Sequence, residues 1–396
     1  MLRRLAALLL AVLPAGPAAA MDADPYCQTA DAPKPEDLCA LIMQAKTANG
    51  AGDTDKALAL LKQARDHPAT VGKTAALVLG QKATAHALRG ETEQALAALQ
   101  SALQFTPNDI WLLMRSCQDH AAADYLPKAQ RDCARARNLL RRVRKEDRPL
   151  VLAYVNYSEA QLALAMEQPQ ITLDRLQTIE SQMPGRIAAR YLNQLRASAL
   201  IAQGDSAGAV QALTDVLASE QAIGLSEQAS LHYLRGLERI AIAANEAGLA
   251  DIRQAIALSR SAEQEAGTRA AQTRSVADQN TLQRATSRTA EYTYTLCAIH
   301  LRSGDVMAAL RDCEALSETA PGQQNHVYLD AWGLAQLEGG RAAEAARTFS
   351  DALEKAPRSS ISYGHLNRAV GQAQAEGKAL DLDEFLTPEA RLFHRK

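Results

Sequence analysis

Cysteines are the residues of this chain whose type and spacing most clearly indicate chemistry. The six are Cys27, Cys39, Cys117, Cys133, Cys297 and Cys313. The last four form two pairs with the same separation of 16 residues. A spacing repeated in two distant regions favours disulfides over the alternative of thiols that only fill a core. Zinc is not expected, because neither pair has two further thiolates or imidazoles at a usual ligand spacing.

The first twenty residues indicate the compartment in which such disulfides would persist. Arg3 and Arg4 precede an uncharged, largely apolar stretch at residues 5–20, which ends in three alanines. This order is typical of a cleaved export signal, so we expect a periplasmic or secreted protein. Initiation at Met21 is the alternative, and it would leave a cytosolic chain.

Catalytic motifs are lacking in this sequence. It contains no glycine-rich phosphate loop and no HExxH. The formal net charge of −2 gives no field that would attract nucleic acid, so no specific nucleic-acid partner is expected. Beyond the leader, no segment has the apolar length of a membrane helix. We therefore expect neither an enzyme nor a cofactor or metal site; an enzyme with an unfamiliar site remains the alternative.

A repeat organises most of the chain. In one segment, small and apolar residues recur at helical spacing, break at Arg89 and Gly90, resume through Leu99 and end at Pro107. A second segment, at residues 326–357, repeats this order. Because a proline ring cannot occupy a helix interior, each segment indicates two helices and a stop.

This pattern resembles the tetratricopeptide repeat (TPR) family, whose unit is about 34 residues in two antiparallel helices. Repeats begin near Leu38, Ala76, Ile110, Ala153, Arg190, Ala290 and His326. Their eighth positions are small: Ala45, Ala83, Cys117, Ala160, Ala197, Cys297 and Gly333. The resemblance implies an all-α, right-handed α-solenoid of about eight antiparallel helical hairpins with a C-terminal capping helix. Few repeats carry the family's large aromatic residue at position 4.

The resemblance also implies an organisation. An N-terminal segment at residues 21–37 would precede a repeat array at 38–359, and a capping helix and tail would follow at 360–396. A further hairpin fits residues 226–266, in a register that the sequence leaves open. The polar stretch at 268–289 is either a loop or an extension of the next helix, and we favour the extension.

Repeat positions give the two cysteine pairs a geometry. In both repeats the cysteines occupy positions 8 and 24, which face each other across an antiparallel hairpin; Cys27 and Cys39 then pair by elimination. Position 11 is histidine in three repeats: His86, His120 and His300. Because a packed tyrosine normally occupies this position in the family, we interpret these histidines as seam residues and not as ligands.

In this family the first helix of each repeat lines a concave groove, chiefly through positions 2, 5 and 9. The residues here are Trp111, Met114, Gln118, Tyr154, Tyr157, Gln161, Tyr191 and Gln194. Aromatic side chains combine contact area with a polar group, which suits a binding surface. We therefore expect a partner-binding groove at repeats three to five. The alternative is that position 2 packs against the preceding repeat.

Residues 131–148 are strongly basic, and the pattern predicts a single helix for them. Its densest part contains Arg141, Arg142, Arg144 and Lys145. A solvated outer helix face explains such a run, and an anionic polymer or a membrane surface is the functional alternative.

Together these features predict a protein–protein interaction scaffold that binds a protein or peptide in its groove, in a role such as cell-envelope assembly. A carbohydrate-export or cell-wall-binding scaffold is the alternative, because aromatic grooves also suit sugars.

Overall fold

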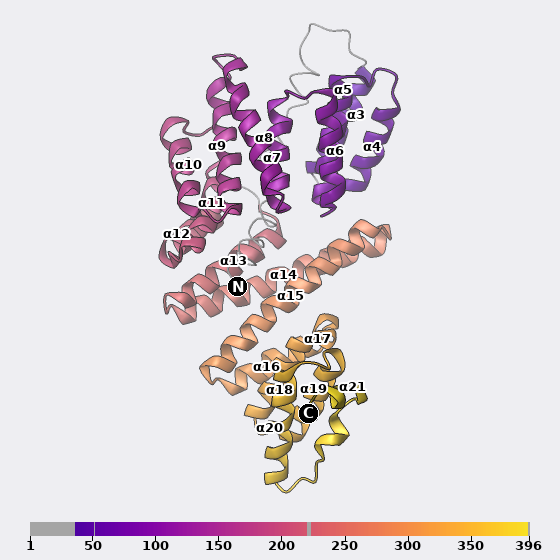
Figure 1. Ribbon diagram of the computed structural model, residues 1–396, viewed down its shortest axis with the longest axis vertical. Helices are drawn as coiled ribbons and strands as arrows, with labels where there is room; N and C mark the ends of the chain where they lie inside the picture. The colour runs from indigo at the N-terminus through magenta and orange to yellow at the C-terminus, as the bar shows by residue number, and fades with distance from the viewer. Residues whose placement is uncertain (1–35, 51, 220–222, 395–396) are drawn as a thin grey trace. The chain divides into compact units, whose positions relative to one another are not determined.

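A computed structural model describes residues 36–50, 52–219 and 223–394. The predicted export signal, Cys27 and most of the segment at 21–37 lie outside the described residues. Within them every regular element is a helix, as predicted (Figure 1). The described chain divides into two compact units: the residues up to 219, together with Ala241–Ala243, and the remaining residues from 223 onward.

The first unit is a stack of five helical hairpins. Its elements are α3 (Glu36–Gly50), α4 (Thr54–Asp66), α5 (Lys73–Leu88), α6 (Thr92–Phe105), α7 (Ile110–Ala122), α8 (Leu126–Leu139), the 3-10 turn η2 (Leu140–Arg142), α9 (Arg148–Ala165), α10 (Pro169–Gln182), α11 (Ala189–Gln203) and α12 (Ser206–Leu217). Odd-numbered helices are the first helices of the repeats.

The second unit begins with longer helices. Its elements are α13 (Leu225–Ala241), α14 (Asn245–Thr273), α15 (Val276–Ser303), α16 (Val306–Ser317), α17 (Ala320–Gln324), α18 (His326–Glu338), α19 (Ala342–Lys355), α20 (Ser360–Ala375), the 3-10 turn η3 (Leu382–Phe385) and α21 (Pro388–His394). The expected capping helix is α20. The expected tail after it is not extended, because Leu386 and Ala390 are buried against the cap.

Local signals in the sequence explain where the hairpins turn. Asp53, Asp205 and Asp305 cap the helices that follow them, each accepting a hydrogen bond from a backbone N–H. Gly204 and Gly304 end the helices before two of these turns with positive φ values of 80° and 74°. A glycine adopts this left-handed conformation without steric cost, so the chain can reverse within two residues.

Small residues at position 8 let the two helices of a hairpin approach closely. Gly333 of α18 shows the requirement most directly, because a Cβ atom built there would lie 2.6 Å from the ring of Phe349 on α19. Phe349 is fully buried. Ala45 and Ala160, at the same repeat position, are also fully buried. The repeat pattern therefore encodes the interhelical seam.

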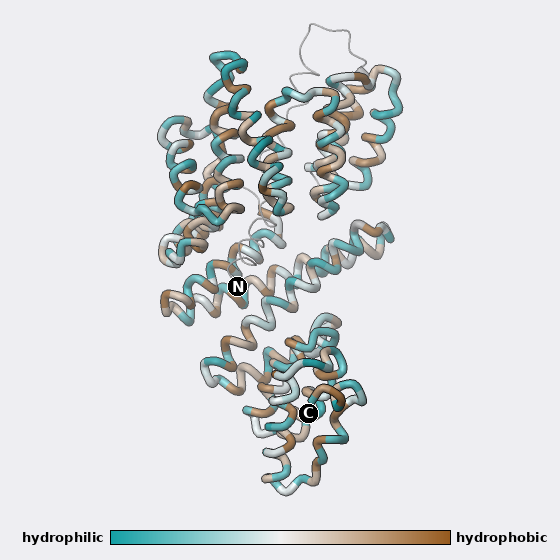
Figure 2. Tube along the Cα trace, in the orientation of Figure 1, coloured by the Kyte–Doolittle hydropathy of each residue, from teal (hydrophilic) through white to brown (hydrophobic). Residues whose placement is uncertain are grey.

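The polar stretch at residues 268–289 is helical on both sides of one turn, with residues 268–273 at the end of α14 and residues 276–289 at the start of α15. It forms the far end of the hairpin α14–α15, which reverses at Arg274 in a left-handed conformation. Ala266, Ala270 and Ala285 are buried along its seam. The far end is otherwise largely hydrophilic (Figure 2). The hairpin expected at residues 226–266 is formed by α13 and α14.

One expected helix is broken. The basic segment at 131–148 comprises the end of α8, the turn η2, an irregular connection and the first residue of α9. Pro149 lies in the first turn of α9, where its ring and missing N–H are tolerated. That proline is the sequence signal that could have located the break.

Candidate partner-binding groove

The candidate groove lies on the first helices of three successive repeats, α7, α9 and α11. Trp111 and Tyr154 begin it: their rings meet edge to face, with centroids 5.2 Å apart. Both side chains are partly exposed. The contact joins repeats three and four, so position 2 serves in packing between repeats while part of each ring remains accessible.

The aromatic surface continues at α11. Arg190 donates a hydrogen bond of 3.0 Å to the Tyr191 hydroxyl, and its guanidinium lies 4.7 Å from the centroid of the same ring. Tyr191 is partly exposed. A cation over an aromatic face holds the ring in place. The three rings of Trp111, Tyr154 and Tyr191 are the accessible aromatic part of the predicted groove.

Four of the predicted groove residues are buried, and the expectation that they contact a partner is wrong for this conformation. They are Met114, Tyr157, Gln161 and Gln194. Tyr157 is 0% exposed, and burial raises the pKa of its hydroxyl far above the usual range. Its position lies three residues after Tyr154, about 60° further around the helix, and that rotation moves it into the core.

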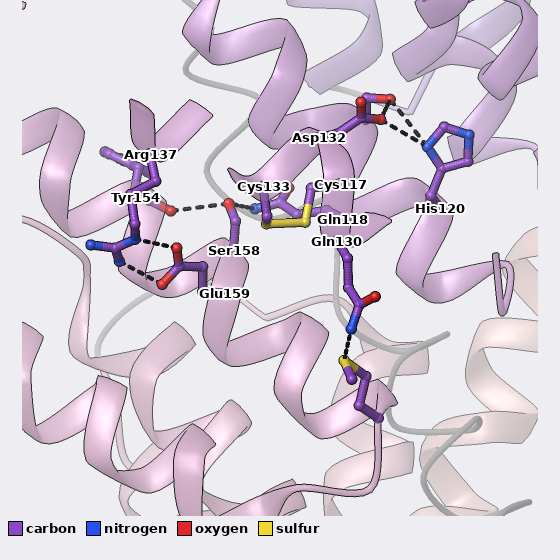
Figure 3. Close-up of a disulfide and its surroundings, with 12 residues drawn as sticks. Cys117, Gln118, His120, Gln130, Asp132, Cys133, Arg137, Tyr154, Ser158 and Glu159 are labelled. Atoms are coloured by element: carbon purple, nitrogen blue, oxygen red, sulfur yellow. Dashed lines mark hydrogen bonds and ion pairs between the residues drawn. A yellow bond between two sulfur atoms is a disulfide. The ribbon is translucent and has the colours of Figure 1, made fainter. Parts of the chain in front are cut away.

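Gln118 is partly exposed, and a hydrogen bond fixes its side chain. Its amide Nε2 donates to Ser158 Oγ at 2.9 Å, and Ser158 Oγ donates in turn to the Tyr154 carbonyl at 3.0 Å (Figure 3). The bond links α7 to α9. Of the three glutamines expected in the groove, Gln118 alone is both accessible and held by this contact.

Directly behind Gln118, a disulfide closes the hairpin α7–α8. Cys117 and Cys133 are bridged, with Cα atoms 5.3 Å apart (Figure 3). Both cysteines are buried. The bridge sits at the two facing repeat positions and fixes the helix that carries Trp111 and Gln118.

A histidine–aspartate pair accompanies this disulfide. His120 Nδ1 lies 3.2 Å from Asp132 Oδ2, and Ser116 donates to the same oxygen at 2.7 Å. Burial alone would raise the pKa of Asp132, but the hydrogen bonds from His120 and Ser116 hold that pKa below its usual value. The pair therefore favours an ionised carboxylate inside the seam.

The second unit repeats this arrangement in the hairpin α15–α16. Cys297 and Cys313 are bridged with the same Cα separation of 5.3 Å. His300 Nδ1 lies 2.8 Å from Asp312 Oδ2. In both hairpins the aspartate follows the histidine by twelve residues and directly precedes the second cysteine.

The three position-11 histidines lie in seams beside carboxylates. His86 Nδ1 lies 2.5 Å from Glu91 Oε2, and its side chain, like those of His120 and His300, is largely buried. Among the described residues no group of three or more histidine, cysteine, aspartate or glutamate side chains is arranged to hold a metal ion. Nor is any described helix both long and apolar enough to cross a bilayer.

Sequence reasoning missed a buried ionic cluster in the second unit. Asp251 of α14 accepts hydrogen bonds from Arg235 and Arg239 and lies 3.0 Å from His232 Nδ1. Burial would raise its pKa, but these three partners lower it to about 2. The partners belong to α13, so the cluster ties the hairpin α13–α14 together. No sequence motif predicts this cluster, because its residues come together only when α13 and α14 pack.

The residues Arg141, Arg142, Arg144 and Lys145 are all exposed; we call them the basic linker. They occupy the connection between α8 and α9 and not the groove. Within the described part of the chain they take part in no ion pair, whereas Arg115 and Arg137 of the same unit pair with Asp119 and Glu159. The basic linker and the candidate groove are therefore two separate surfaces of the first unit.

Comparisons with solved structures agree with a TPR-type fold. The apo form of RapI resembles the chain at a TM-score of 0.52 and 9% identity, covering 87% of this chain and 99% of that one. A tetratricopeptide repeat protein from Parabacteroides merdae ATCC 43184 aligns over 84% of this chain and 99% of that one, with 14% identity and a TM-score of 0.37. Searches of protein-family models and of curated proteins gave no match. At these identities the likeness shows the fold alone: a helical solenoid of the TPR type.

Proposed function

We propose that this chain is an exported interaction scaffold that binds a segment of a partner protein along α7, α9 and α11. The observation that carries the proposal is the row of partly exposed aromatic rings at Trp111, Tyr154 and Tyr191. Large aromatic side chains held rigidly at a surface supply the anchors of many interfaces.

The surroundings of these rings suit a peptide. Gln118 presents an amide beside them, held by Ser158, and amides pair with the N–H and C=O groups of a peptide backbone. The helices that carry the rings are fixed by a disulfide and by repeat packing, so little side-chain freedom is lost on binding.

Export is part of the proposal and rests on two independent features. The leader at residues 1–20 has the order of an export signal. Two disulfides at matched positions close hairpins in separate units, and such bonds persist mainly outside the cytosol. A role in assembling the cell envelope fits this compartment.

Site-specific photocrosslinking in the native host would test the groove. A photoreactive amino acid replaces Gln118, and a matched probe replaces Gln130, which is exposed on the second helix of the same repeat. We expect a discrete partner adduct from position 118 and none from position 130. The captured partner is then purified for affinity measurements.

A pair of double variants would measure the contribution of the rings. Trp111→Ala with Tyr191→Ala should weaken binding of that partner about thirtyfold, from a loss of about 2 kcal/mol. The control is Tyr294→Ala with Tyr328→Ala in the second unit, where two partly exposed rings meet at 5.0 Å. Equal affinities for the two variants, with unchanged melting curves, would remove the groove as the site.

The carbohydrate alternative is decided by the same variants. Aromatic faces and amides also bind sugars, so a glycan array probed with the intact protein tests this class of ligand directly. Binding to a glycan that depends on Trp111 and Tyr191, together with no protein adduct at position 118, would replace the peptide by a carbohydrate.

A further inference from the structure

The two ends of the helices in the first unit differ in charge. Because successive helices are antiparallel, the turns inside hairpins lie at one end of the stack and the connections between hairpins lie at the other. We call these the turn end and the linker end. Each hairpin turn holds one acidic residue: Asp53, Glu91, Asp124, Glu167 and Asp205. The linker end instead contains the basic linker, whose four cations outnumber the carboxylates of Glu146 and Asp147 that follow it in the same connection, so the two ends differ in the sign of their charge.

The fold holds the basic linker in a defined conformation. Leu139, Leu140 and Val143 pack inward against the core around Leu113 and Val151. Backbone hydrogen bonds from Val143 to Leu140 and from Arg148 to Arg144 fix the connection, with N–O distances of 3.1 and 3.0 Å. Since the apolar residues between the charges face the core, the charged side chains are directed to solvent.

Exposed apolar side chains occur at the same end. Phe105, the last residue of α6, is 51% exposed, and Val71, in the connection between α4 and α5, is 69% exposed. Arg135 of α8 donates a hydrogen bond of 2.7 Å to the Pro107 carbonyl. This bond joins α8 to the connection that follows Phe105. The linker end thus combines clustered cations with apolar side chains that project from the same edge.

We propose that the linker end docks on the surface of a bilayer that contains anionic phospholipids. The basic linker lies against the headgroup phosphates, and the ring of Phe105 enters the interface between headgroups and acyl chains. A soluble polyanion would be bound by the cations alone and would leave Phe105 and Val71 in water. The combination of charge and exposed apolar side chains therefore favours the bilayer. The acidic turn end is repelled by the same surface, which orients the unit with its linker end toward the lipid.

Vesicle co-sedimentation of the intact protein tests this proposal. The probes are vesicles of 30% phosphatidylglycerol in phosphatidylcholine and vesicles of phosphatidylcholine alone, which control for binding by apolar segments elsewhere in the chain. Each basic side chain near an anionic surface strengthens binding roughly fivefold. Replacing all four residues of the basic linker by glutamine should therefore weaken binding to the anionic vesicles by nearly three orders of magnitude. Binding of the unchanged protein should also fall steeply as salt rises.

The chain offers a control of equal charge change. Arg253, Arg260, Arg269 and Arg347 are exposed in the second unit, and replacing these four by glutamine should leave vesicle binding unchanged. Phe105→Ser should reduce binding to anionic vesicles without changing its salt dependence. All variants alter exposed side chains, and circular dichroism melts check their folding.

Two results would overturn the proposal. Equal vesicle binding by the two quadruple variants would show that the basic linker contributes nothing specific. Binding to heparin that depends on the basic linker, with no binding to anionic vesicles, would assign the surface to a soluble polyanion. Partner capture at the groove is measured separately, so either proposal can fail without the other.

Discussion

The hairpins α7–α8 and α15–α16 belong to different units, yet the same kinds of contact join their two helices. Each has a buried disulfide with a Cα separation of 5.3 Å and, beside it, a histidine next to an aspartate. They differ at the residue before the first cysteine. Ser116 in the first hairpin donates to Asp132, whereas buried Leu296 occupies this place in the second.

This difference changes what holds each carboxylate. Asp132 receives hydrogen bonds from two seam residues, His120 and Ser116. Asp312 has His300 on the buried side and Arg311, an exposed side chain, on the other. The first hairpin also adjoins the candidate groove through Gln118. Similar internal contacts thus stabilise both hairpins, and in the first they also adjoin the candidate groove.

The largest effect we expect is loss of a disulfide, and it should be the same in the two hairpins. Each bridge has a sequence separation of 16, so the chain-entropy model gives about 3 kcal/mol for each. The variants are Cys117→Ala with Cys133→Ala, and Cys297→Ala with Cys313→Ala. The protein has two tryptophans, Trp111 in the first unit and Trp332 in the second, so single-tryptophan variants report urea unfolding of each unit separately.

Clearly unequal losses would show that the two bridges constrain different unfolded ensembles, which would break the comparison. Non-reducing peptide mass mapping of the exported protein provides the control. Free thiols at positions 117, 133, 297 and 313 would contradict both bridges. The same map would test the predicted pair of Cys27 and Cys39.

Replacing the seam histidine should lower the stability of the two hairpins by different amounts. The His300 side chain is 3% exposed and that of His120 is 15% exposed. His300→Ala leaves a cavity and removes the buried partner of Asp312, so we expect a loss of about 2–3 kcal/mol. His120→Ala leaves Ser116 bound to Asp132, and about 1 kcal/mol should be lost. The tryptophan signal of the affected unit measures each value, and equal losses would show that Ser116 gives no compensation.

Residue types and spacing were sufficient to predict the helical repeat and the two bridged hairpins. Both rest on strong local constraints: Gly333 must be small because Phe349 packs on it, and cysteines at positions 8 and 24 face each other in any hairpin of this length. The position-11 histidines were correctly interpreted as seam residues for the same reason.

The candidate groove was less predictable, because accessibility depends on small rotations. Tyr154 and Tyr157 share one broad face of α9, yet one ring is partly exposed and the other is fully buried. Spacing alone does not resolve a difference of about 60° around a helix axis. The ionic cluster around Asp251 was invisible for a related cause, since its partners come from a helix whose register the sequence left open.

The smallest effect we expect is on the pH dependence of stability of the first unit, through the carboxylate of Asp132. Its lowered pKa means that it stabilises the first unit above the ordinary aspartate pKa of about 3.9, and that this contribution is lost as pH falls through the folded-state pKa. Ser116→Ala removes one of the donors that hold the pKa down. The variant should therefore be about 1 kcal/mol less stable at neutral pH.

The pKa of Asp132 should also move back toward its usual value in Ser116→Ala, so that the first unit of the variant loses less stability on acidification and its stability approaches that of the unchanged protein at low pH. Urea unfolding followed by Trp111 fluorescence between neutral pH and pH 3 measures this shift, and Ser101→Ala on α6, whose hydroxyl bonds only its own helix, is the control. The second unit, with Leu296 at the equivalent place, should respond to acid identically in the protein and both variants. If Ser116→Ala lowers stability equally at every pH, the serine packs the seam without holding the carboxylate, and the difference between the hairpins is one of shape and not of charge.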